Sequence, residues 1–313
     1  MNSQQPPART PKIGLVLGAG GPVGHAFHAG VLAALERNVG FDARLADVIV
    51  GTSAGAQVAA LLRAGMAGED LVARAAGEPL SEAAQSISQN FVRPCHKTPD
   101  ASLPKSAWPA SPQFLLHSLP RPRHWRPGRV VAALLPEGRV RLDAQTAGLQ
   151  AIFGGGWPER ETLITAVELD RGERIAFGAA GAPGIDLGTA VSCSSAVPGV
   201  YKPVDWQGRR YVDGGVASGT HLDLLADRPL DLVIVSSPLS MFAPIRALVA
   251  LERRRLERSL PVLLIEPERE LLALMGRNPM DLARAAMVAR AACEATQRKL
   301  DSREVRALLR RAF

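Results

Sequence analysis

The sequence KIGLVLGAGGPVG (residues 12–24) joins a continuous apolar run to a cluster of glycines. A second stretch, ADVIVGTSAGAQVAALLRAG (residues 46–65), repeats the order of apolar run, glycine-containing turn and alanine-rich segment. Continuous apolar runs are typical of strands that are buried on both faces of a parallel sheet, with helices as connections. We therefore predict two strand–turn–helix units, with strands over 12–18 and 46–51 and helices over 24–38 and 54–65.

The rest of the chain continues this α/β pattern. The stretch ETLITAVELDRGERIAFG (161–178) predicts a hairpin, because two strand-like runs flank the turn DRGE. Further expected elements are buried strands over 231–238 and 261–268, a basic amphipathic helix over 245–260, and one or two helices within 281–311. This order predicts an α/β fold with a mostly parallel central sheet.

The segment between about residues 80 and 130 is different, because it is rich in proline and serine. Its stretch LPRPRHWRPGR (119–129) contains three prolines, which disfavour a regular helix, and surrounds Trp125 with cationic side chains. We expect an irregular excursion, which is either an ordinary loop or a basic-aromatic contact with a membrane interface. The expected organisation is a disordered leader over 1–11, one folded domain over 12–290 and a helical extension over 291–313.

Composition limits the kinds of site that the chain can hold. Hydrophobic residues make up 47% of the 313 residues, which supports a large core. No uninterrupted apolar run approaches the roughly 18 residues of a transmembrane helix. The three cysteines, Cys95, Cys193 and Cys293, form no CxxC pair, so neither a disulfide framework nor a zinc site is predicted, and a cytoplasmic location is expected.

The net charge of +7 is carried mainly by arginine. It reflects either a bias in the composition of the genome or attraction to a polyanion such as an anionic membrane. Only 4% of the residues are aromatic, so stacking on single-stranded nucleic acid is disfavoured and no nucleic-acid partner is expected. Peripheral contact with an anionic membrane therefore stays open, and so does the oligomeric state.

The sequence GTSAG, from Gly51 to Gly55, follows the second predicted strand and begins the second predicted helix, as a G-x-S-x-G nucleophile motif requires. The turn leaves no space for a Cβ on either side of the serine, which explains the two glycines. Ser53 then lies at a helix N-terminus, where backbone N–H groups and the helix dipole stabilise negative charge. The alternative is a serine that caps the helix, with Thr52 and Ala54 as small neighbours.

A serine nucleophile needs a general base. The only histidine after Asp213 is His221, eight residues on, and no strand and loop intervene to bring it back, so a Ser–His–Asp triad lacks its histidine. The stretch YVDGGVASG (211–219) offers a carboxylate instead, because an apolar strand ends at Asp213, and Gly214 and Gly215 let the backbone bend sharply. A carboxylate in a dry site acts as a base without an imidazole. Taken alone, Asp-Gly-Gly is more often a turn.

The glycine cluster fits either a loop that binds the pyrophosphate of a dinucleotide or a loop whose N–H groups stabilise an oxyanion. A dinucleotide site requires G-x-G-x-x-G spacing and an acidic residue at the end of the second strand. Here Ala19 stands where the first glycine of the strict pattern belongs, and the second strand ends in Gly51 and Thr52. The dinucleotide alternative is therefore disfavoured.

Three motifs occur in order: the glycine loop G-x-G-G-x-x-G (18–24), then GTSAG, then DGG (213–215). Together they resemble the patatin-like phospholipase family of lipid acyl hydrolases. The stretches AVSCSSAVPGVYKPVDWQGRRYVDGG (190–215), AVELDRGERIAFG and IEPERELLALMGRNPMD are similar to further segments of that family. The resemblance covers most of residues 12–290, apart from roughly 80–160.

The resemblance implies a three-layer α/β/α sandwich, a lipid or other ester as substrate, and no metal or cofactor. It implies that Ser53 is the nucleophile and that Asp213 is its base in a Ser–Asp dyad. It places the oxyanion hole at Gly20 and Gly21, with the amide of Val23. The remaining motif residues are Gly18 and Gly24 of the glycine loop, Gly51, Thr52, Ala54 and Gly55 of the nucleophile elbow, and Gly214 and Gly215 of the DGG motif.

Some residues depart from the family pattern. Val23 stands where many relatives carry Arg or Lys, and Pro22 has no N–H to donate, although Ala54 can supply a further amide. After the DGG motif this chain has SGTHLDLLAD, in which His221 either shapes the pocket or lies on the surface, and we expect the surface. A catalytically weak or silent lipid-binding protein of the same fold is therefore the alternative to an enzyme.

Overall fold

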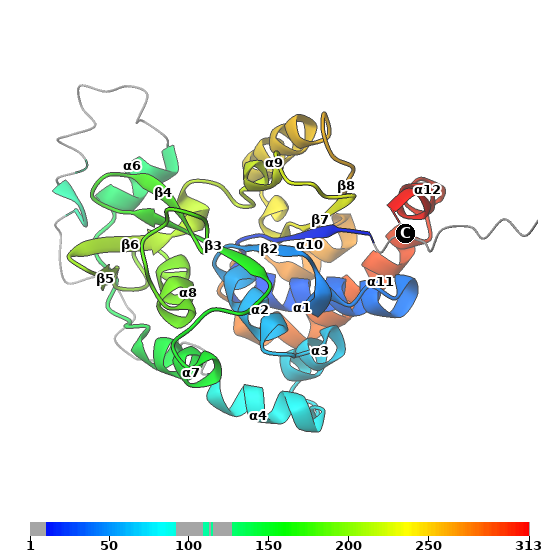
Figure 1. Ribbon diagram of the computed structural model, residues 1–313, viewed down its shortest axis with the longest axis horizontal. Coiled ribbons are helices and arrows are strands. Elements are labelled where there is room, and N and C mark those ends of the chain that lie inside the picture. Colours follow the sequence, from blue (N-terminus) through cyan, green and yellow to red (C-terminus); the bar gives the residue numbers. More distant parts are fainter. Residues whose placement is uncertain (1–10, 92–108, 113, 115–126, 313) are drawn as a thin grey trace, which may run out of the picture.

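The computed structural model of the chain describes residues 11–91, 109–112, 114 and 127–312. In these residues one eight-stranded sheet has the order β5-β6-β3-β2-β1-β7-β8, with β4 paired to β3 (Figure 1). The strands are β1 (Ile13–Leu17), β2 (Val48–Gly51), β3 (Glu161–Glu168), β4 (Glu173–Phe177), β5 (Val204–Trp206), β6 (Arg209–Asp213), β7 (Leu232–Ser236) and β8 (Val262–Ile265).

The central strands are parallel. β1 pairs in parallel with β2 and β7, β2 pairs with β3, and β7 pairs with β8. β4 and β6 run antiparallel to β3, and β5 runs antiparallel to β6. The predicted α/β fold with a mostly parallel sheet is therefore confirmed, together with both strand–turn–helix units and the hairpin of β3 and β4.

Helices cover both faces of the sheet (Figure 1). They are α1 (Gly21–Val39), α2 (Ala54–Arg63), α3 (Gly68–Ala76), α4 (Glu82–Asn90), α6 (Pro127–Leu134), α7 (Asp143–Phe153), α8 (Leu187–Ser195), α9 (Ala243–Leu256), α10 (Arg269–Met275), α11 (Ala285–Leu300) and α12 (Arg303–Ala312). Short 3-10 turns that matter for the site are η4 (Gly214–Val216), η5 (Leu222–Leu225) and η6 (Pro238–Met241).

The three layers follow from the alternation of side chains along each strand. Leu15 and Leu17 of β1 lie in the core cluster that includes residues of α1, α2 and α11. Val16, between them, lies in the separate cluster that includes Val249 and Leu256 of α9. Because both faces of β1 are covered, its apolar run is continuous rather than alternating. This explains why the first stretch of the sequence predicts the fold so well.

Two predicted regions differ in the structure. The first helix begins at Gly21, three residues earlier than expected, because Pro22 needs no hydrogen-bond acceptor in the first turn. The expected irregular segment begins with helix α4, which Ser81 caps by accepting a hydrogen bond from the amide of Ala84 at 3.3 Å. Residues 119–126, including the basic stretch around Trp125, lie outside the described residues.

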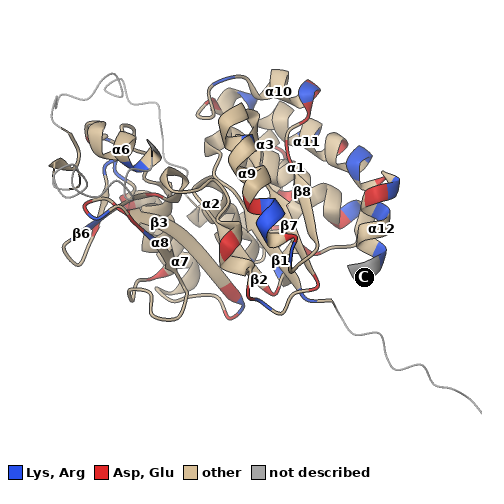
Figure 2. Ribbon diagram, turned by 90° about the horizontal axis from the view of Figure 1, so that it is seen from above, with Lys and Arg blue, Asp and Glu red and all other residues tan. Residues whose placement is uncertain are grey.

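The C-terminal helices pack on the core rather than extending away from it. The expected boundary between residues 290 and 291 falls inside α11, which lies along α1 (Figure 1). Gly30 of α1 permits this close approach, because a Cβ there would overlap with the carbonyl oxygen of Ala289. Figure 2 shows many Lys, Arg, Asp and Glu residues along α9, α11 and α12. No described helix is long and apolar enough to cross a bilayer.

Candidate active site

The loop after β1 and the turn after β2 meet at one edge of the sheet, because the carboxyl ends of neighbouring parallel strands lie side by side. The amide of Thr52 donates to the carbonyl of Leu17 at 3.0 Å and so ties the two connections together. On the other side of β1, the amide of Gly18 donates to the carbonyl of Ser236 at 3.0 Å, and that of Ala19 donates to Gly219 at 2.8 Å. The glycine loop is thus fixed on both sides.

Ser53 lies between β2 and α2 in a strained backbone conformation. Its φ is +54° and its ψ is −118°, which is costly for any residue with a Cβ and aims the side chain away from the strand. Its amide donates to the hydroxyl of Ser194 at 2.9 Å. The flanking glycines are sterically required, as the sequence predicts. A Cβ on Gly51 would lie 2.7 Å from Cα of Ala56, and one on Gly55 would overlap with the carbonyl of Leu17.

Asp213 ends β6 and reaches Ser53 from the neighbouring part of the sheet. Its carboxyl is almost completely buried, with 6% of the residue exposed. Its Oδ1 accepts a hydrogen bond from the amide of Gly215 at 2.7 Å, and the Ser53 side chain lies beside it. Burial raises the pKa of Asp213 to about 6, although the Ser53 side chain and the Gly215 amide oppose the shift by stabilising the carboxylate. The carboxyl is therefore poised to exchange a proton near neutral pH.

Three backbone amides beside Ser53 have no acceptor among the described residues: those of Gly20, Gly21 and Ala54. Val23 differs, because its amide donates to the carbonyl of Pro279 at 3.1 Å. This bond corrects the expectation that Val23 offers a free donor. Gly21 cannot be replaced easily, because its φ is +58° and a Cβ would lie 2.7 Å from the Pro279 oxygen.

Two buried histidines brace the loops that carry these groups. His28 of α1 approaches the carbonyl of Gly18 with Nε2 at 2.8 Å and the hydroxyl of Ser236 with Nδ1 at 2.7 Å. A carbonyl oxygen only accepts, so Nε2 carries the proton and Nδ1 accepts from the serine. Burial lowers the pKa of His28 to about 4, so the imidazole is neutral at physiological pH. No local sequence pattern predicts this role for His28.

His221 corrects a second expectation. It is fully buried, with 0% exposed, rather than on the surface. Its backbone is left-handed, with φ of +56°, and this conformation turns the side chain inward so that Nε2 meets the carbonyl of Gly214 at 3.1 Å. Burial, together with the positive charge of Arg174, lowers its pKa to about 4. His221 therefore supports the residue that directly follows Asp213.

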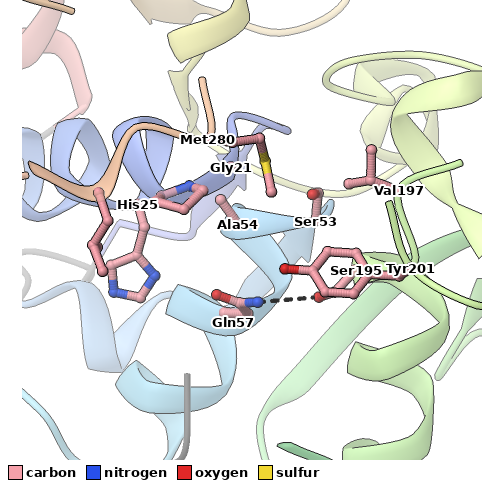
Figure 3. Close-up of a pocket in the computed structure, with 11 residues that line it drawn as sticks. Gly21, His25, Ser53, Ala54, Gln57, Ser195, Val197, Tyr201 and Met280 are labelled. Carbon is pink, nitrogen blue, oxygen red and sulfur yellow. Dashed lines mark hydrogen bonds between the residues drawn. The ribbon is translucent and has the colours of Figure 1, made fainter. Parts of the chain in front are cut away.

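Two cavities meet at Ser53. The larger has a volume of about 350 Å³, and its wall includes Ser53, Asp213 and apolar side chains of α6 and of the segment around Pro279. The smaller has a volume of about 40 Å³ and extends past Ala54 toward Gln57 and Tyr201. Figure 3 shows Gln57 and Tyr201 on one side of Ser53 and Met280 on the other. An apolar cavity that opens onto a nucleophile suits the hydrocarbon part of an ester.

The amide side chain of Gln57 forms part of a polar network below Ser53. It donates to Gln145 at 2.9 Å and to Ser195 at 3.3 Å, the latter shown by the dashed line in Figure 3. In the described part of the chain, no group of three or more His, Cys, Asp or Glu side chains is arranged to hold a metal ion. Cys193 and Cys293 are buried and free.

A sequence model of the patatin-like phospholipase family matches residues 15–226. Among solved structures, VipD from Legionella pneumophila is 12% identical, with a TM-score of 0.42 over 94% of this chain and 67% of that one. Human GIVD cytosolic phospholipase A2 is 12% identical, with a TM-score of 0.45 over 97% and 63%. ExoU, in its complex with SpcU from Pseudomonas aeruginosa, is 21% identical, with a TM-score of 0.32 over 93% and 53%. This chain thus spans between 53% and 67% of their lengths.

Proposed function

Because this chain belongs to the patatin-like phospholipase family, we propose that it is a lipid acyl hydrolase in which Ser53 and Asp213 form the catalytic dyad. One observation carries the proposal. A strained serine lies beside a buried carboxyl group whose charged form the serine side chain stabilises, at the point where three amides lack an acceptor among the described residues. The match to the family covers both residues, from the glycine loop to beyond the DGG motif.

In the first step, the Ser53 hydroxyl oxygen attacks the carbonyl carbon of the ester while its proton passes to Asp213. Burial favours this transfer, because it raises the proton affinity of the carboxyl group. The hydrogen bond from Gly215 to Oδ1 holds the carboxyl in place during the transfer. A pKa of about 6 leaves most of the carboxyl ionised at neutral pH, so it is able to accept the proton.

The ester oxygen becomes negatively charged in this step. The amides of Gly20, Gly21 and Ala54 are the donors that we assign to it, in place of the set that included Val23. Preorganised backbone donors of this kind typically lower the barrier by about 2.7–4 kcal/mol each. Because Ser53 lies at the N-terminus of α2, the positive end of the helix dipole also stabilises this negative charge.

The intermediate then collapses, and the bond between the carbonyl carbon and the alcohol oxygen breaks. The departing oxygen takes the proton from Asp213, and the acyl group stays on Ser53. A water molecule then attacks this acyl group and gives its proton to Asp213. Ser53 leaves with that proton, and the carboxylic acid is released. A single carboxyl group therefore serves as base and acid in both halves of the reaction.

The decisive variant is Ser53→Ala. We expect it to lower hydrolysis of p-nitrophenyl butyrate by about a thousandfold or more, and to abolish labelling by a fluorophosphonate. Ser86→Ala is the matched control, since Ser86 is exposed and lies on α4. It should hydrolyse and label like the wild type. Equal activity of a folded Ser53→Ala protein would contradict the proposal.

The alternative is a protein of this fold that binds lipid without cleaving it. It predicts that Ser53 in the wild type resists the fluorophosphonate, and that p-nitrophenyl esters and lipid esters are both stable in its presence. Mass spectrometry of the labelled protein distinguishes the two functions, because it locates the phosphonyl group on Ser53 or finds none.

A further inference from the structure

We propose that helix α6 docks the protein onto a lipid bilayer and opens the apolar cavity directly to it. The choice of lipid as the occupant rests on the proposed function. The surface consists of the exposed side of α6, which lines the larger cavity, together with Leu282, which lines the smaller one. We call it the α6 rim.

One side of α6 is apolar and exposed. Val131 is 53% exposed, Leu134 is 52% and Leu135, the residue after the helix, is 38%, and these positions are three and four residues apart, so they lie on one side. Val131 and Leu135 line the larger cavity, and Leu134 does not. The inward side is formed by Ala132 and Ala133, which are almost completely buried. Single exposed apolar side chains are common on soluble proteins, but three on one helical face form a patch that needs a partner.

The patch is held rigidly against the active site. The carbonyl of Ala133 accepts a hydrogen bond from the amide of Ser111 at 3.2 Å, and that of Leu135 accepts one from Ala110 at 3.0 Å. At the start of the helix, Gly128 touches Val216, and a Cβ there would overlap with the Val216 carbonyl. Val216 lies three residues after Asp213 in the chain, so α6 packs directly on the turn that follows Asp213.

An apolar path runs from this surface to the nucleophile. Val131 and Leu135 line the same cavity as Ser53, and Met280 faces them from the other wall. Leu282, which is 46% exposed, lines the smaller cavity on the far side of Ser53. A lipid chain that leaves a bilayer along this path stays in contact with apolar groups and avoids the cost of exposure to water.

The charges around the rim suit an anionic membrane. Residues 127–143 and 277–284, which contribute its two sides, contain five arginines and three acidic residues. Each acidic residue is paired with an arginine: Glu137 with Arg210 at 2.8 Å, Asp143 with Arg141 at 2.5 Å, and Asp281 with Arg284 at 2.8 Å. Arginines beside an apolar helical face attract anionic headgroups, and this attraction weakens with salt. Figure 2 shows α6 largely free of charged residues, in contrast to α9 and α12.

The test compares Leu134→Asp with Leu248→Asp. Leu134 does not line either cavity, and Leu248 is a comparably exposed leucine, 61% exposed, on α9. Binding is measured by co-sedimentation with phosphatidylcholine–phosphatidylglycerol vesicles in the Ser53→Ala background, where lipid is not consumed. Activity is measured on p-nitrophenyl butyrate in solution and on the vesicles, with Ser53 intact.

We expect Leu134→Asp to weaken vesicle binding and vesicle hydrolysis by about tenfold or more, because a leucine buried in lipid contributes at least that factor. Hydrolysis of the soluble ester should stay within about twofold of wild type, since this ester needs no membrane. Leu248→Asp should change neither. Pure phosphatidylcholine vesicles should bind more weakly than the mixture, with less dependence on salt.

Three results would overturn the proposal. One is vesicle binding by Leu134→Asp equal to that of the wild type. The second is an equal loss with Leu248→Asp. The third is a shift from dimer to monomer in sedimentation velocity with Leu134→Asp, which would assign the patch to a second copy of the chain. If the wild type fails to hydrolyse the soluble ester, the proposed function fails, but co-sedimentation still decides whether α6 binds lipid.

Discussion

The two loops that meet at Ser53 are each supported by a buried, neutral histidine, but the two histidines are bonded differently. His28 uses both ring nitrogens, one on Gly18 and one on Ser236, and so joins α1, β1 and β7. His221 uses only Nε2, on Gly214. Its Nδ1 is buried without a hydrogen-bond partner among the described residues, and its backbone is in the left-handed region.

The site therefore has two unlike halves. Beside the glycine loop, both ring nitrogens of the histidine are hydrogen-bonded, whereas beside Asp213 one ring nitrogen is not and the histidine backbone is strained. In the proposed mechanism, the glycine-loop half needs only to hold amides still, because an oxyanion is stabilised by donors that do not move. In that mechanism the Asp213 half must accommodate a proton that arrives and departs in each step. An unsatisfied nitrogen and a positive φ both cost stability, and such costs concentrate where a protein functions. The comparison predicts unequal consequences when either histidine is removed.

The largest effect is expected from His28→Ala. It leaves the Gly18 carbonyl and the Ser236 hydroxyl buried without their partner and creates a cavity, so we expect about 3–5 kcal/mol less stability. Chemical denaturation measures this loss. His28→Gln should recover part of it, because the amide can still donate to Gly18. A loss no larger than that for His221→Ala would show that the second hydrogen bond of His28 adds nothing to stability.

The second-largest effect is expected in the pH dependence of stability when Asp213 is replaced. Its pKa in the folded protein, about 6, is above the unfolded value of 3.8, so the folded state binds the proton more tightly and stability falls as pH rises between these values. Asp213→Asn removes this cost. We expect its stability relative to wild type to increase from pH 4 to pH 8 by up to about 3 kcal/mol. Asp223→Asn is the control, since that carboxylate is exposed and pairs with Arg174. A difference in stability between Asp213→Asn and wild type that stays constant across this pH range would show that the pKa of Asp213 is not raised in the folded protein.

The smallest effect is expected from His221→Ala, at about 1–2 kcal/mol, because only one hydrogen bond is lost. His221→Gly should cost less than His221→Ala, since glycine adopts a φ of +56° without strain. The same denaturation experiment compares both variants. If His221→Gly is the less stable of the two, the left-handed backbone is not a source of strain.

Much of the site could be predicted from the sequence because its motifs are local. Gly51 and Gly55 flank the serine within one turn. A Cβ on Gly51 would meet Ala56 in that turn, whereas one on Gly55 would meet the Leu17 carbonyl of the adjacent strand β1. The prediction for Val23 failed for the opposite reason. Its amide is taken by Pro279, which is distant in sequence, and no local pattern reports such a contact.

The roles of the two histidines and of α6 were also not predicted, because they depend on the tertiary structure. His28 lies 208 positions from Ser236, so its role depends on β7 being adjacent to β1. His221 lies in a polar stretch that is typical of a surface turn, and its burial follows from its left-handed backbone conformation. Helix α6 lies beyond a segment whose prolines argue against regular structure, yet it begins at Pro127, a residue that is well suited to a first turn.

The sequence alone therefore predicts the central sheet, the glycine-flanked serine turn and the family. Each of these depends on apolar runs and glycine spacings that act over a few residues. Only the tertiary structure decided which amides lack an acceptor, which histidines support the loops and where an apolar helix meets the cavity mouth. These properties depend on whether distant groups satisfy one another's hydrogen bonds and cover one another's apolar surface, and that is settled only when the layers pack.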